Sequence, residues 1–290
     1  MFFEQRGGQL DRLTGTPAGV YSWQWEGRCL LGGQLPGAHQ GPPVTGLIFH
    51  MSRCGSTLLA RLLAEDPSTL VLNEPDVVNM LLKESLSAND CGSTDSVDAA
   101  LAQAIARIGS QVDSDAHRIV IKTTSWNAAK ASTLMRAFPD ARCVFLERDP
   151  RAVLASLDRN PPGWAIASNA WLLGDDRDPT SPSSFASALS HVTQGVRSAV
   201  ATESTRWRSA SYVDLPGAAE SVAEWFGVAT RPVVDSLGSV SAVHSKTGAA
   251  WRPDQDAPAD ASVGVEEIRP IEWAMNEVES LIARAIGDSR

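Results

Sequence analysis

The chain has 290 residues, 43% of them hydrophobic and 20% charged, and its net charge is −9 at pH 7. This length and composition are typical of a globular protein with one large α/β domain, or with a core domain and extensions. The acidic balance argues against a nucleic-acid groove, an acidic membrane surface and a polyanionic acceptor, but it leaves room for a local basic pocket.

The sequence gives no sign of a membrane span, a signal peptide or a metal site. No apolar run approaches the thickness of a bilayer, and the N-terminus lacks a basic stretch followed by an apolar one. The cysteines have neither metal-ligand spacing nor a CxxC pattern: they are Cys29, Cys54, Cys91 and Cys143. We therefore expect a cytoplasmic protein with reduced thiols, which binds no metal, nucleic acid or membrane.

Residues 1–43 are rich in Gly and Trp and are expected to form a small β-rich extension, followed by an α/β domain over residues 44–290. Apolar runs predict strands at 46–50, 71–72, 118–122, 142–146 and 208–212. Helical spacing predicts helices at 55–65, 76–86, 97–108, 127–138, 149–158, 216–226 and 271–282. Polar, turn-rich stretches predict loops at 89–95, 174–184 and 253–262. The alternation of strands and helices indicates right-handed βαβ units and a parallel sheet.

The first strand runs into a short polar loop that resembles a phosphate cradle. After His50, the segment Met51–Thr57 contains one Gly and several hydroxyls, and a helical pattern follows at once. Backbone N–H groups at a helix N-terminus, aided by the helix dipole, bind anions. The segment is not a Walker A motif, because Arg53 precedes Gly55, whereas the P-loop Lys follows its Gly. This difference points away from ATP hydrolysis.

A second signal lies where the 142–146 strand meets the next helix. Asp149 is a suitable N-cap, and Pro150 suits the first helical turn. Arg148 lies between strand and helix, where its planar fork can hold a phosphate, and Ser156 follows two turns into the helix. The alternative is that Arg148 only pairs with a nearby carboxylate.

Polar groups follow most of the predicted strands. Ligands bind at the carboxyl ends of the strands of an open parallel sheet, so these groups are expected to gather there, although loops are polar in general. They are Arg53, Asn73–Glu74, Lys122–Ser125, Glu147–Asp149 and Tyr212–Asp214.

Taken in order, these motifs resemble the sulfotransferases that use 3′-phosphoadenosine 5′-phosphosulfate (PAPS). Ser52–Leu58 looks like their 5′-phosphosulfate loop, commonly Pro-Lys/Arg-Ser-Gly-Thr-Thr. Arg148–Ser156 looks like their 3′-phosphate motif, with Arg and Ser at the family's spacing, and Tyr212–Leu215 is similar to their Tyr-Glu-Asp-Leu. The resemblance covers residues 47–251 and implies a three-layer αβα fold with a central parallel sheet, like that of P-loop NTPases.

The resemblance also implies roles for individual residues. The 5′-phosphosulfate would be held by Arg53, Cys54, Gly55, Ser56, Thr57 and Leu58. Arg148 and Ser156 would hold the 3′-phosphate, and Tyr212 would lie near the adenine. Lys122 resembles the strand-end Lys that reaches the sulfonate in transit. Lys246 matches the late basic loop that closes over the nucleotide, with loose spacing.

The resemblance implies an in-line transfer of sulfonate to an acceptor hydroxyl or amine, without a metal. Cytosolic small-molecule enzymes use the His of a Lys-Thr-His motif as the base, but this chain has Thr124 at that place. The carboxylate-base branches have a Glu soon after the first helix, where Glu74 stands. We expect Glu74 to be the base; a salt bridge from Glu74 to Arg53 or Lys122 is the structural alternative. We expect a small-molecule acceptor, and a peptide tyrosine stays open.

Several other interpretations stay open. His50 could titrate near the loop, although a strand-end His is more often structural. Cys54 lies at a helix N-terminus, which favours thiolate, but a Cys-based phosphatase loop would need an Arg where Ala60 stands. Trp164 and Trp171 could line an acceptor pocket. The alternative functions are an ATP-dependent small-molecule kinase on a P-loop-like scaffold and a non-catalytic nucleotide-binding protein.

Overall fold

The computed structural model describes residues 3–6, 9–12, 20–21, 41–87, 94–112, 115–162, 182–242 and 264–287. Its centre is a six-stranded sheet in the order β3-β5-β6-β4-β7-β8, in which every neighbouring pair is parallel. The strands are β3 (Val20–Tyr21), β4 (Val44–His50), β5 (Thr69–Asn73), β6 (Arg118–Lys122), β7 (Arg142–Glu147) and β8 (Trp207–Ser211).

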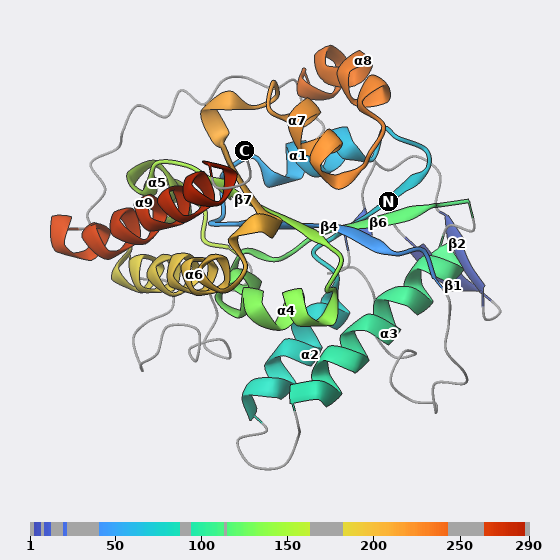
Figure 1. Cartoon of the computed structure of the whole chain (residues 1–290), viewed down its shortest axis with the longest axis horizontal. Coiled ribbons are helices and arrows are strands. Elements are labelled where there is room, and N and C mark those ends of the chain that lie inside the picture. Colours follow the sequence, from blue (N-terminus) through green and yellow to red (C-terminus); the bar gives the residue numbers. More distant parts are fainter. Residues whose placement is uncertain are drawn as a thin grey trace.

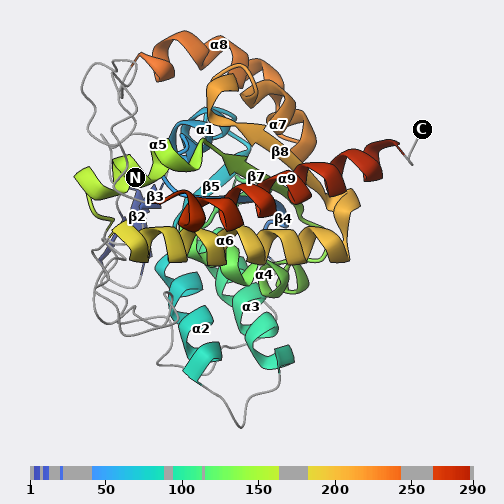
Figure 2. The same ribbon diagram turned by 90° about the vertical axis from the view of Figure 1, so that its left-hand side faces the viewer.

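Helices cover both faces of this sheet, which gives the three layers that the family resemblance implies (Figures 1 and 2). On one face lie α1 (Ser56–Leu63), α7 (Ala219–Phe226) and α8 (Thr230–Ser241). On the other lie α2 (Asp76–Ser87), α3 (Thr94–Val112), α4 (Ala131–Ala137) and α6 (Pro182–Thr202). The helix α9 (Val265–Gly287) packs along α6, and α5 (Pro150–Arg159) follows β7.

The strand β4 shows why these residues form a central strand. Leu47 and Phe49 join the core beneath α2, α3, α4 and α6, whereas Ile48 joins the core beneath α1, α7 and α8. Successive side chains of a strand point to opposite faces, so an uninterrupted apolar run is buried on both sides of a sheet. Phe49 also stacks on Trp207 of β8, with ring centroids 5.2 Å apart.

The helix prediction is wrong in several places. The long helix α6 and the helix α8 are missing from it, and residues 182–184, predicted as loop, belong to α6. The predicted 127–138 helix is a 3₁₀ helix, η2 (Ser125–Lys130), that continues into α4. The helix α3 begins at Thr94, inside a predicted linker, and α9 begins at Val265 and includes Pro270.

The described part of residues 1–43 consists mainly of strands. The strands β1 (Phe3–Arg6) and β2 (Gln9–Arg12) form an antiparallel hairpin, and β3 pairs with β5 at the edge of the large sheet. Among the helices that the structure describes, none combines the length and the apolar character needed to cross a bilayer.

Candidate functional site

The loop between β4 and α1 has an unusual backbone. Ser52, Arg53 and Gly55 have φ angles of 76°, 50° and 77°, all in the left-handed region. Gly55 is the N-cap of α1 and has no side chain that could cap the N–H groups of the first turn. Successive N–H groups in such a loop form a concave site for an anion, and the helix dipole adds to its positive potential.

Gly55 is required here by conformation and by space. Its φ of 77° is one that L side chains rarely adopt. A Cβ at this position would lie 2.8 Å from Cδ1 of Leu215 and 3.1 Å from Cδ2 of Tyr212. The segment after β8, which the family resemblance associates with the adenine, therefore packs directly on the loop.

Arg148, which follows β7, packs against the loop between β4 and α1. Its Nη1 donates a hydrogen bond of 2.9 Å to the carbonyl oxygen of Arg53, and its guanidinium stacks on the Tyr212 ring at 4.3 Å from the centroid. Asp149 caps α5 by accepting a hydrogen bond from the backbone N–H of Arg151, with Pro150 in the first turn, as predicted. Ser156 is half-buried on α5. Distant segments thus bring Arg53, Arg148 and Tyr212 together.

Glu74 and Lys122 meet at the ends of neighbouring strands. Asn73 pairs with Lys122 in the β5–β6 register, and the backbone N–H of Glu74 donates to the carbonyl oxygen of Lys122 at 2.7 Å. Glu74 has a φ of 53°, and its carboxylate forms an ion pair with Nζ of Lys122. The side chain of Lys122 is 1% exposed and that of Glu74 is 26% exposed. The expected alternative, a salt bridge from Glu74 to Lys122, is therefore present in the structure.

Arg53 interacts electrostatically with Glu74. Burial lowers the pKa of the Arg53 guanidinium, and the negative charge of Glu74 raises it, with a net shift downward. Nη2 of Arg53 donates a hydrogen bond of 2.5 Å to the carbonyl oxygen of Asn160, just after α5. Lys122, Arg148 and Glu74 thus lie around the loop that contains Arg53, and the three cations make the site positive within an acidic chain.

Cys54 is a buried residue of the loop, although a helix N-terminus by itself favours a thiolate. The side chain is fully buried, and burial raises the pKa of its thiol to about 12, despite the opposing charge of Lys122. A protonated, inaccessible thiol is not a nucleophile. Ser56 and Thr57 are buried as well, and Leu58 is half-buried. The loop therefore offers a ligand mainly its backbone N–H groups.

His50 serves the structure of the loop. Its Nε2 donates to the carbonyl oxygen of Thr123 at 2.9 Å, and its Nδ1 accepts from the N–H of Ser52 at 3.1 Å. Both ring nitrogens are therefore engaged with the backbone, which favours the structural interpretation over a catalytic base. The sequence shows the residue but not these through-space partners.

Asn73 is one of the polar residues expected at the strand ends, and its surroundings are unusual. Its side chain is fully buried, and neither its amide oxygen nor its amide nitrogen has a hydrogen-bond partner in the described structure. A buried polar group without a partner is uncommon, and a catalytic or ligand-binding role is one of the reasons for which it occurs. The available signal was an Asn at the end of an apolar strand, directly before Glu74.

Some predicted residues lie outside the described ranges, namely Lys246, Trp164 and Trp171. Within those ranges, no cluster of three or more His, Cys, Asp and Glu side chains is arranged to hold a metal ion. The roles of the site residues and the use of no metal therefore stay predictions.

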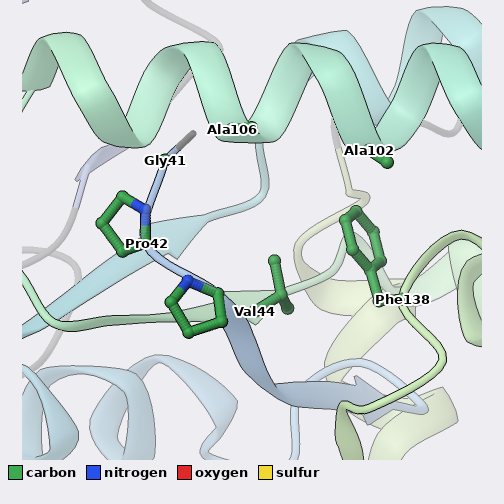
Figure 3. A pocket seen from close by; sticks show the side chains of 7 residues that line it. Gly41, Pro42, Val44, Ala102, Ala106 and Phe138 are labelled. Carbon is green, nitrogen blue, oxygen red and sulfur yellow. The ribbon is translucent and has the colours of Figure 1, made fainter. Parts of the chain in front are cut away.

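An open depression at the opposite edge of the sheet has different chemistry (Figure 3). It lies where Pro42 and Val44 face α3, and Phe138 and the small side chains Ala102 and Ala106 complete it. Its lining has no side chain that can transfer a proton or bind an anion. The polar site at the carboxyl ends of the strands is therefore the candidate functional site.

Comparison with known proteins shows the family to which the chain belongs. A family model described as "Sulfotransferase family" matches residues 47–209, more than half of the chain. The solved sulfotransferase STF9 from Mycobacterium avium shares 14% identity at a TM-score of 0.50, covering 81% of this chain and 76% of its own. The sulfotransferase domain of the Synechococcus PCC 7002 olefin synthase shares 16% identity at a TM-score of 0.48, covering 83% and 97%. No curated protein matches the chain significantly. The matched segment contains the loop, Glu74, Lys122 and Arg148, and the chain belongs to the sulfotransferase family.

Proposed function

We propose that the protein transfers a sulfonate group from PAPS to an acceptor hydroxyl or amine. The observation that carries this proposal is the cluster of Arg53, Lys122 and Arg148 around a left-handed loop at the N-terminus of α1. Three cations and a set of backbone N–H groups suit a donor with several anionic groups. The net charge of the whole chain is −9, so the positive charge of this site is a local feature and does not follow from the overall composition.

The two ends of the donor would contact different residues. The loop 53–58 would bind the 5′-phosphosulfate, with Arg53 beside the bridging oxygen. Arg148 and Ser156 would bind the 3′-phosphate, and the Tyr212 ring, already stacked on Arg148, would lie near the adenine. Arg148 distinguishes this proposal from ATP chemistry, because ATP has no 3′-phosphate. Lys246 would close over the nucleotide.

In the proposed reaction, the acceptor oxygen or nitrogen forms a bond to sulfur while the bond from sulfur to the bridging oxygen breaks. The products are the sulfated acceptor and 3′,5′-adenosine bisphosphate, and the acceptor proton passes to Glu74. Lys122 would stabilise the charge that develops on the sulfonate. The Glu74–Lys122 ion pair holds the proposed base beside the proposed sulfonate ligand. We take the acceptor to be a small molecule.

Calorimetric titration tests the donor site. Wild-type protein and Arg148→Ala are titrated with 3′,5′-adenosine bisphosphate, AMP and ATP with Mg²⁺. We expect the wild type to prefer the bisphosphate without a metal, and Arg148→Ala to lose this preference. The exposed substitution Arg231→Ala on α8 is the matched control.

The other outcomes identify the alternatives. Preference for ATP with Mg²⁺ would overturn the proposal in favour of a small-molecule kinase. Bisphosphate binding without transfer to any acceptor in a panel of phenols, alcohols and amines would indicate a non-catalytic nucleotide-binding protein.

A further inference from the structure

The imidazole of His50 joins two parts of the candidate site that are far apart in sequence. His50 is the last residue of β4 and is 4% exposed. On one side, its Nδ1 accepts the N–H of Ser52, the first left-handed residue of the loop. On the other side, its Nε2 donates to the carbonyl oxygen of Thr123, the residue after Lys122. One ring therefore connects the loop to the end of β6.

The end of β6 is itself fixed to β4, so the connection is rigid. Thr123 is fully buried. Its N–H and its hydroxyl both donate to the carbonyl oxygen of Ile48, at 3.1 Å and 3.0 Å. The carbonyl oxygen of Thr123 accepts the hydrogen bond from His50. Thr123 is therefore held through three polar groups, namely its N–H, its hydroxyl and its carbonyl oxygen. Lys122 directly precedes it, so the position of Lys122 relative to the loop depends on these contacts.

The pair of contacts requires one form of the ring. A neutral imidazole with its proton on Nε2 has a donor on one side and an acceptor on the other, as this geometry demands. An imidazolium has no acceptor, and the other neutral tautomer has its donor and acceptor exchanged. Without the ring acceptor, the buried N–H of Ser52 would lose this partner in a conformation that L residues adopt at a cost.

We infer that His50 is a positioning residue, whose neutral imidazole holds the backbone of the donor loop in its left-handed conformation and in register with Lys122. The inference rests on the proposed function insofar as it takes this loop as the donor site. It gives the imidazole no part in proton transfer. The hydrogen bond to Ser52 shapes the loop, and the hydrogen bond to Thr123 orients the ring.

Three substitutions separate the two hydrogen bonds. An Asn side chain places its oxygen near the Nδ1 position, so His50→Asn keeps an acceptor for Ser52. A Gln side chain reaches the Nε2 position with its amide nitrogen, so His50→Gln keeps the donor to Thr123 and loses the acceptor. His50→Ala loses both. Ile105→Val, in the core of α3, is the control for general destabilisation.

The first measurement is amide hydrogen exchange at Ser52 in the protein without ligand. We expect exchange at Ser52 to become at least about tenfold faster in His50→Ala and His50→Gln, because a buried donor loses its acceptor. His50→Asn and Ile105→Val are expected to retain the protection. Affinity for 3′,5′-adenosine bisphosphate should follow the same order, with a loss of about tenfold or more in His50→Ala and His50→Gln.

Unchanged Ser52 exchange in His50→Gln would overturn the inference, and so would equal losses in His50→Asn and His50→Gln. If His50→Ala does not fold, the comparison of the Asn and Gln variants still decides. If the wild type fails to bind the bisphosphate, the proposed function fails, while the exchange experiment still shows whether the imidazole holds the loop.

Discussion

Glu74 and Lys122 form an ion pair whose members differ in their access to water. Lys122 is 1% exposed, whereas about a quarter of the Glu74 side chain is exposed. A buried ammonium that loses its partner cannot be hydrated, but a partly exposed carboxylate can. The two halves of the pair are therefore not equivalent, either for stability or for the proposed chemistry.

This asymmetry predicts the effect of substitutions on stability. Glu74→Gln should lower the free energy of unfolding by about 3 kcal/mol, because it leaves the buried charge of Lys122 without its partner. Lys122→Met should cost less, since water can reach Glu74. The double variant should recover most of the loss of Glu74→Gln. Urea unfolding of the four proteins measures the coupling, and strictly additive losses would contradict it.

The proposed role of Glu74 predicts a separate effect on turnover. Glu74→Gln should lower kcat by about 10²- to 10⁴-fold, the usual contribution of a general base. Affinity for 3′,5′-adenosine bisphosphate should change little, because Glu74 does not contact the donor in the proposal. Transfer from labelled PAPS to the best acceptor of the panel measures the rate. Glu65→Gln, at an exposed site after α1, is the control. A variant with wild-type kcat would exclude Glu74 as the base.

At the scale of elements, the hydrophobic pattern of the sequence best predicts the strands that are buried on both faces of the sheet. The strands β4, β6 and β7 were predicted to within about two residues because their apolar runs are continuous. The helix α6 is absent from the prediction although Phe185, Leu189 and Val192 recur at helical spacing, because its Ser-rich start is typical of a loop. The choice between 3₁₀ and α geometry in η2 depends on packing that a sequence does not show.

The candidate site likewise has features that the sequence predicts and features that only the structure shows. Strand ends and helix starts are local features, so Arg53, Glu74, Lys122 and Arg148 could be named from the sequence. Contacts through space could not: the sequence does not show that His50 links Ser52 to Thr123, or that Asn73 lacks a partner. The burial that keeps Cys54 protonated likewise comes from tertiary packing.

Asp66 connects three elements on the amino side of the sheet. Its carboxylate accepts hydrogen bonds from Thr69 of β5, from Arg118 of β6 and from the N–H of Ala229 before α8. Burial alone would raise the pKa of Asp66, but the hydrogen bonds from Thr69, Ala229 and Ser68 outweigh it and lower the pKa overall. The ionised carboxylate is therefore the form that stabilises the fold.

The sign of this shift predicts an acid limb in the stability profile. Because the pKa is lower in the folded than in the unfolded state, the contribution is complete above the unfolded value near 4 and is lost as the pH falls through the folded value. Asp66→Asn should lower the free energy of unfolding at pH 7 by roughly 1–3 kcal/mol and flatten the acid limb. Unfolding midpoints between pH 2 and pH 7 measure both effects. Asp235→Asn, in an exposed pair, should change neither, and an unaltered acid limb in Asp66→Asn would contradict the assignment.

At the scale of the whole molecule, the strand order assembles the proposed donor site. The strand β4 lies between β6 and β7, so the loop after β4 has Lys122 on one side and Arg148 on the other. Segments from the first quarter to the last third of the chain therefore meet at one edge. Substitutions that shift one strand relative to its neighbours would disturb several groups of the site at once.

The last helix, α9, contacts the carboxyl ends of the strands through Glu147, a second carboxyl group with a shifted pKa. Glu147, the buried last residue of β7, faces Glu279 of α9. Burial and the neighbouring Glu279 raise the pKa of Glu147 to about 8. A carboxyl with a raised folded pKa is most favourable while protonated, so its contribution is complete below the unfolded value and is lost as the pH rises through the folded value.

The molecule should therefore also lose stability as the pH rises from the mildly acidic range to about 8. Between about pH 4.5 and pH 8, ionisation of Glu147 in the unfolded chain draws the equilibrium toward unfolding, and the loss levels off above pH 8. Glu147→Gln, which keeps a neutral side chain of the same shape, should remove this slope, and Glu279→Gln should reduce it. Glu224→Gln, at an exposed position of α7, serves as the control. Denaturant midpoints at half-unit steps from pH 5 to pH 9 measure the slope. A Glu147→Gln profile parallel to that of the wild type would show that other groups cause the loss of stability between pH 5 and pH 8.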